Sequence, residues 1–222
     1  DVLNGYYTYV AGSGRWSVGG TTALTDADDN PDAVAGILYK QVAGTVTAVI
    51  ASVPAGVTGY LTFKVDVKST APAGIIPNWA TFSYTDGSDT ITGTSNTANF
   101  LVTTTADVTI TGDTVTDAPQ GATVDFENVV TNTGNTTDTF NITVSGSTFP
   151  AGTAFALYQS NGTVPLQSTD ADMIPDTGPL APGASYTVVL KATLPPTATG
   201  GPYTVNKTAT SANDPTVSDT AT

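Results

Sequence analysis

The sequence predicts an all-β protein that consists of two tandem antiparallel β-sandwich modules. Three observations support this prediction: apolar and polar residues alternate, turn-forming residues recur at short intervals, and part of the sequence is repeated. Strict alternation buries one face of a strand and exposes the other. Abundant Thr and Val favour sheets, because β-branched side chains pack better on a pleat than along a helix.

Alternation locates the clearest strands. Three runs have the period of a half-buried strand, at residues 61–67, 140–144 and 186–191. In one of them Phe140, Ile142 and Val144 share a face, and we expect that face to lie in a core. Turn signals containing Gly separate the runs, at residues 133–135, 161–162 and 181–183. Short strands separated by frequent turns are typical of sandwiches.

The internal repeat predicts the domain organisation. Residues 25–32 and residues 169–176 are identical at six of eight positions. Two weaker matches follow in the same order, so we interpret the chain as a duplication with modules at 1–104 and 105–222. The first module has little sequence ahead of its octet. It is either an incomplete sandwich, completed by a neighbouring domain or a donated strand, or closed by its own N-terminal strands.

Composition and charge exclude several classes of function. The formal net charge is −13, from 19 acidic and 6 basic residues, so the surface repels nucleic acid and anionic membranes. The chain has no Cys and no His, which excludes thiolate or imidazole metal sites and every Ser-His-Asp arrangement. An acidic surface attracts divalent cations, or it serves solubility alone.

The chain has no apolar run long enough to span a membrane. The longest, at residues 45–57, is short and interrupted by Pro54. We therefore expect no direct membrane insertion. The sequence starts at Asp1 without a leader and stops at Thr222 within a strand-like pattern, so we interpret it as a processed chain or part of a longer one.

The repeated octet is the best candidate for a site. Each copy places three Asp residues at relative positions 1, 3 and 7: Asp26, Asp28 and Asp32 in the first copy, and Asp170, Asp172 and Asp176 in the second. Calcium takes six to eight hard oxygen ligands, and Asp-rich loops supply them from alternate side chains. The pattern predicts a Ca²⁺ site in each loop. The alternative is a polar turn in which the Asp side chains accept hydrogen bonds from backbone amides.

Two other constellations bear on function. Glu127 is the only Glu, and alternation places it on the solvent face of a strand, so we expect no glycosidase and no other enzyme. The aromatic residues near the N-terminus and in the first module could instead form a platform for sugars or fill a core: Tyr6, Tyr7, Tyr9, Trp16 and Trp79.

A family resemblance enters at residues 126–135, which read FENVVTNTGN, and at residues 139–144, which read TFNITV. With the Gly-Pro-Leu-Ala-Pro-Gly turn at 178–183, they resemble the DUF11-like immunoglobulin-like repeats of bacterial and archaeal surface proteins, including Deinococcus-type envelopes. The resemblance covers most of the second module and the later two-thirds of the first. It implies immunoglobulin-like sandwiches at the cell surface, with a structural or adhesive role and no known catalysis.

The functional expectation follows from these points. We expect a non-catalytic, extracellular spacer or assembly module of a surface layer or filament, whose partners are further copies of itself or neighbouring surface-protein domains. The alternative is an adhesive or glycan-binding module that recognises cell-envelope polysaccharide. Self-assembly of the purified chain favours the first function, and binding to isolated polysaccharide favours the second.

Overall fold

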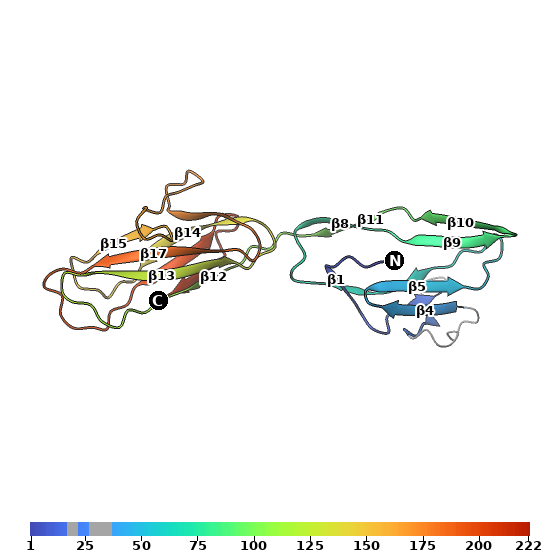
Figure 1. Cartoon of the computed structure of the whole chain (residues 1–222), viewed down its shortest axis with the longest axis horizontal. Helices are drawn as coiled ribbons and strands as arrows, with labels where there is room; N and C mark the ends of the chain where they lie inside the picture. Colours follow the sequence, from blue (N-terminus) through green and yellow to red (C-terminus); the bar gives the residue numbers. More distant parts are fainter. Residues whose placement is uncertain (17–21, 27–36) are drawn as a thin grey trace. The chain divides into compact units, whose positions relative to one another are not determined.

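The computed structural model describes residues 1–16, 22–26 and 37–222, and these residues form strands and turns without helices (Figure 1). All strand pairs are antiparallel. The predicted all-β class is confirmed. The described residues include no helix with the length and hydropathy needed to cross a membrane. The chain divides into two units, unit 1 (Asp1–Val102) and unit 2 (Thr103–Thr222).

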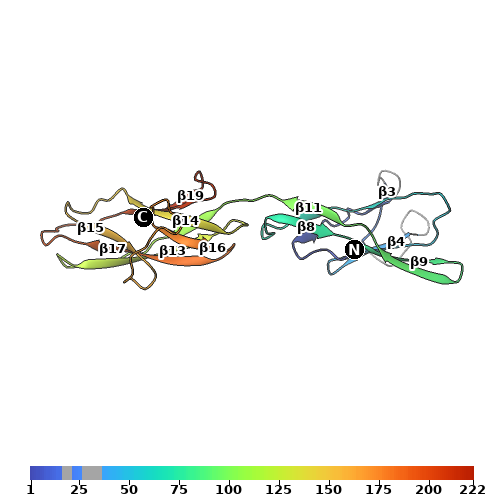
Figure 2. The same cartoon turned by 90° about the horizontal axis from the view of Figure 1, so that it is seen from above.

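Unit 2 is a sandwich of two four-stranded sheets (Figure 1 and Figure 2). The first sheet has the order β12 (Val108–Thr111), β13 (Thr123–Asn132), β17 (Ser185–Thr193), β15 (Ala154–Tyr158). The second has the order β16 (Asp176–Leu180), β14 (Asp138–Ser145), β18 (Asn206–Ser211), β19 (Ser218–Ala221).

The core of unit 2 lies between the two sheets. Val130 and Val188 project into it from the first sheet, and Phe140, Ile142 and Ala209 project from the second. The predicted alternation of residues 140–144 accounts for this, because Phe140 and Ile142 are buried on the same face of β14.

Unit 2 also protects an edge where its sheets meet. Strands β12 and β19 belong to different sheets and are in contact. The backbone amide of Ile110 on β12 donates a 2.8 Å hydrogen bond to Asp219 Oδ2 on β19. A side chain therefore satisfies an edge amide that would otherwise be open to pairing with another chain. Edge strand β16 contains Pro179, which has no amide hydrogen to offer.

The described residues of unit 1 form five smaller sheets. Four of them have two strands: β1 (Tyr7–Tyr9) with β7 (Val65–Val67), β4 (Ile37–Val42) with β5 (Thr45–Ile50), β8 (Gly74–Asn78) with β11 (Ala98–Val102), and β9 (Thr81–Asp86) with β10 (Asp89–Thr94). The fifth has the order β3 (Thr22–Ala23), β2 (Arg15–Trp16), β6 (Leu61–Thr62).

The single strand predicted at residues 61–67 is divided in the structure. Its first part, β6, pairs with β2, and its second part, β7, pairs with β1. Between them, the Lys64 amide donates to Ser13 Oγ at 2.9 Å, and the Lys64 carbonyl accepts from the Val10 amide at 3.0 Å. Residues 61–66 still alternate between half-buried and exposed side chains, and Phe63 packs against the core of unit 1. The chain changes sheets because these local partners replace ladder hydrogen bonds.

The core of unit 1 lies mainly around β4 and β5, where Ile37, Tyr39 and Val46 are buried together with Leu24. The Tyr39 ring lies directly over Gly14, and a Cβ at Gly14 would lie 2.6 Å from Tyr39 Cε1. Close packing at this point therefore requires glycine.

The β9–β10 hairpin lies outside this core, on the opposite side of unit 1 from β4–β5 (Figure 1). Phe82 and Tyr84 stack on one of its faces with ring centroids 6.4 Å apart, and Ile91 lies directly across from Tyr84. The Phe82 ring covers Gly93 on the neighbouring strand. All three of these large side chains are exposed, as are Ile75 and Leu101 on β8 and β11.

Candidate functional site

The second Asp-rich loop joins the region after β15 to the first residue of β16. Asp176 begins β16 and is buried at 2% exposure. Its carboxylate accepts hydrogen bonds from the Thr169 amide (2.5 Å), the Thr169 hydroxyl (2.7 Å) and the Gly178 amide (2.6 Å). These three donors compensate the loss of solvation of the buried carboxylate. Asp176 therefore closes the loop at its base.

Asp172 organises the exposed part of the loop. Its Oδ1 accepts from the Ile174 amide at 2.7 Å and from the Ser168 hydroxyl at 3.2 Å, while its Oδ2 accepts from Asn141 Nδ2 at 2.6 Å. The Ile174 amide, followed by the side-chain donors, holds the pKa of Asp172 below its ordinary value. Asp170 Oδ1 accepts from Ser168 and from the Asp172 amide.

The loop backbone is strained between these carboxylates. Ala171 and Met173 have φ values of 67° and 69°, in the left-handed region that residues with a Cβ seldom adopt. Both residues alternate with Asp positions, and the Asp hydrogen bonds hold the turn in this conformation. The strain is compensated locally by those bonds.

The first Asp-rich loop is described only at its start. Asp26 accepts a 2.6 Å hydrogen bond from the Tyr9 hydroxyl and a 2.7 Å bond from the Gly12 amide. Burial, and then the hydrogen bond to Asp26, raise the pKa of Tyr9 above its ordinary value. The other two predicted ligands, Asp28 and Asp32, lie outside the described residues.

A calcium ion requires several oxygens that converge on one point. Within residues 1–16, 22–26 and 37–222, no group of three or more potential ligand side chains comes together in this way. In the second loop, Asp176 points into the base and Asp172 is occupied by its own loop and Asn141. The contacts of the described Asp side chains in this loop are those of a polar turn, the alternative to a metal site. The calcium site stays a prediction.

The structure contains a buried lysine that the sequence did not lead us to expect. Lys207 on β18 is 2% exposed, and its Nζ donates to the Val205 carbonyl at 3.2 Å. Nζ also lies 5.9 Å from the centre of the Phe126 ring. Burial lowers the pKa of Lys207, and the charge of Asp113 opposes this effect. The alternation of the sequence is the feature that could have predicted this burial, because Lys207 lies on the same inward face of β18 as Ala209.

Lys207 borders a cavity of unit 2, which has a volume of about 660 Å³. Phe126, Phe149 and Tyr203 line it, and so does the loop at residues 113–118. Phe149 and Tyr203 have ring centroids 5.2 Å apart. The cavity combines apolar surface with a single buried ammonium group and the nearby carboxylate of Asp113.

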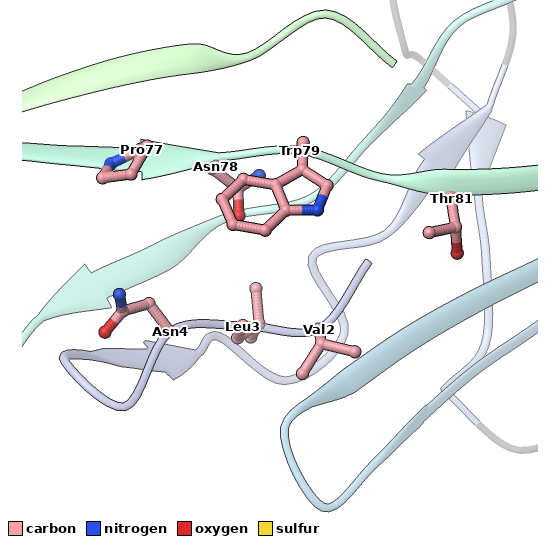
Figure 3. Close-up of a pocket in the computed structure, with 7 residues that line it drawn as sticks. All are labelled: Val2, Leu3, Asn4, Pro77, Asn78, Trp79 and Thr81. Carbon is pink, nitrogen blue, oxygen red and sulfur yellow. The ribbon is translucent and has the colours of Figure 1, made fainter. Parts of the chain in front are cut away.

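A second cavity lies in unit 1, with a volume of about 320 Å³. Figure 3 shows Trp79 projecting from the β8–β9 segment toward the N-terminal residues Val2 and Leu3. Asn4 and Asn78 lie at the same cavity, and Thr81 borders it from β9. The half-exposed indole of Trp79 is therefore surrounded by apolar, amide and hydroxyl side chains.

The structure separates the aromatic residues singled out in the sequence. Tyr9 and Trp16 pack against the core of unit 1, where Trp16 lies over Gly59. Tyr7 instead contacts Phe100 of β11 edge to face at 6.4 Å. Trp79 lines the cavity in unit 1, and the described residues that line it with Trp79 include none of the tyrosines.

Glu127, the residue on which the glycosidase alternative depended, is an exposed residue of β13. In comparisons with known proteins, no family model matches the chain and no curated protein is significantly similar to it.

Proposed function

We propose that the protein is a non-catalytic structural module of an extracellular surface layer or filament, and that unit 1 joins it to a neighbouring module. The observation that supports this proposal is the exposed apolar surface of the β8–β11 and β9–β10 strand pairs. Its large exposed side chains include Ile75, Phe82, Tyr84 and Leu101. Large exposed apolar side chains that lie close together, as Phe82, Tyr84 and Ile91 do on the β9–β10 hairpin, mark interaction surfaces.

The strand edges of unit 1 support the same proposal. Among the described strands, β9 and β10 pair only with each other, so both outer edges of this hairpin are unpaired. A two-stranded hairpin is marginal in water by itself, and an extended segment from a neighbour can pair with such an edge. The donated-strand hypothesis for the first module is therefore part of the proposal.

The charge distribution favours contact through this surface. Residues 74–102 carry two acidic side chains, Asp86 and Asp89, and no basic ones, although the whole chain has a net charge of −13. Charge repulsion between two copies that meet through this segment would therefore be weak. The occupant we propose is a second copy or a neighbouring surface-protein domain with a similarly neutral, apolar face.

Sedimentation velocity and electron microscopy of the purified chain test this function. We expect concentration-dependent assembly that is lost when Phe82, Tyr84 and Ile91 are all replaced by Thr. The matched control changes the opposite face of the same hairpin, with Thr85→Ser, Thr90→Ser and Thr92→Ser, and should assemble normally. A chain that stays monomeric at every concentration, or a Thr variant that assembles like the control, would overturn the proposal.

Calcium is a separate variable in the same experiment. Since the second loop is held by its own hydrogen bonds, we expect Asp172→Ala to lower the melting temperature equally in chelator and in millimolar calcium. A melting temperature that rises with calcium in the original chain, but not in Asp172→Ala, would instead support the predicted metal site.

A further inference from the structure

We propose that the unit 1 cavity beside Trp79 is a subsite for a neutral saccharide. Such a ligand has an apolar face of ring C–H groups and a rim of hydroxyls that both donate and accept hydrogen bonds. The cavity presents the matching groups: one indole face, with amide and hydroxyl side chains around it (Figure 3).

Trp79 supplies the stacking surface. It is 52% exposed, and it lies between β8 and β9 rather than in the core. The other tryptophan, Trp16, is packed so closely against Gly59 that a Cβ there would lie 2.6 Å from Trp16 Cη2. A large aromatic side chain held at a cavity wall, with one end in water, is typical of a contact surface for a ligand.

The two amides at the cavity are oriented by the protein and keep hydrogen-bonding capacity. Asn4 Oδ1 accepts from the Tyr6 amide at 3.1 Å, and among the described residues the Asn4 Nδ2 donors have no acceptor. Asn78 Nδ2 donates to Asp1 Oδ2 at 2.8 Å, and in the described part of the chain Asn78 Oδ1 has no hydrogen-bond partner. The cavity therefore offers donors from Asn4, an acceptor from Asn78 and the hydroxyl of Thr81.

Charge decides the class of saccharide. The residues that line the cavity carry no charged side chain, and the carboxylate of Asp1 lies beside it in contact with Asn78. With a net charge of −13, the chain repels uronic-acid and phosphate-bearing glycans. The ligand class that charge does not exclude is a neutral hexose or N-acetylhexosamine unit of a polysaccharide. A cavity of about 320 Å³ can hold one such unit.

Tryptophan fluorescence of the full chain provides the test, because the protein has only two Trp residues. In a Trp16→Phe background, Trp79 is the sole indole. The probes are neutral hexasaccharides of glucose, mannose, galactose and N-acetylglucosamine, with polygalacturonate as the acidic comparison. We expect a saturable change in emission with at least one neutral probe and none with polygalacturonate. No change with all four neutral probes, or equal binding of polygalacturonate, would overturn the proposal.

Calorimetric titration of variants locates the site. Trp79→Ala should weaken binding of the responding probe by about tenfold, and Asn4→Ala by about threefold. Tyr60→Ala is the matched control, because Tyr60 is 55% exposed, does not line the cavity and lies outside the β9–β10 hairpin. Unchanged affinity in Trp79→Ala and Asn4→Ala would contradict this assignment. So would loss of self-association, rather than of saccharide binding, in Trp79→Ala, because the cavity would then be occupied by a second copy.

Discussion

The two units use similar residues in different ways. Unit 2 buries Phe140 completely between two four-stranded sheets, whereas unit 1 leaves Phe82 on an open hairpin. Unit 2 also satisfies an edge amide through Asp219, and the β9–β10 hairpin has no strand beside either edge within the described residues. The difference indicates that unit 2 is stable by its own packing, while part of unit 1 is suited to contact with another molecule.

The largest expected effect tests the contrast between the two phenylalanines. Phe140→Ala should lower the free energy of unfolding of unit 2 by about 3–5 kcal/mol, because it leaves a cavity in a closed core. Phe82→Ala should change the stability of unit 1 by less than about 1 kcal/mol, because an exposed ring loses little packing. Urea unfolding of both variants measures this difference, and similar losses would contradict the comparison.

A smaller effect concerns the Asp residues at the ends of the two loops. Asp176→Ala should cost about 2–3 kcal/mol, since it leaves the buried amide of Gly178 and the partly buried amide of Thr169 without an acceptor. Asp26→Ala in unit 1 should cost about 1 kcal/mol, because its donors, the Tyr9 hydroxyl and the Gly12 amide, are less buried. Asp170→Ala, at the loop surface, is the control for urea unfolding. Equal losses of unfolding free energy in Asp176→Ala and Asp26→Ala would contradict the difference in burial between their hydrogen-bond donors.

The smallest effect is a pH dependence that arises from Lys207. Burial lowers its pKa in the folded state, so above that pKa and up to about 10.4 the unfolded chain binds more protons than the folded chain. Stability should therefore rise with pH through this window. In Lys207→Met the rise should be weaker, while the tyrosines titrate in both proteins alike. Identical pH profiles between about pH 8 and 10.5 would show that the ammonium group reaches water.

The candidate sites were predictable to different degrees. The repeated octet located both Asp-rich loops, and its second copy is a hydrogen-bonded turn around Asp172 and Asp176. Spacing alone does not distinguish a polar turn from a metal site, because both need carboxylates at alternate positions, and the calcium site stays a prediction. The role of Trp79 could not be predicted either, since its partners Asn4 and Asn78 are brought together only by the fold.

The sequence by itself determined the all-β class and the inward faces of the long strands. Alternation is a local property, so the order of residues along the chain is enough to assign Phe140 and Ile142 to a core. Only the tertiary structure decided which strands close into a sandwich and which remain open. Residues 81–86 alternate as clearly as residues 140–144, yet Phe82 and Tyr84 are exposed, since no second sheet formed by the described residues covers them. Burial depends on long-range packing, and local periodicity does not encode it.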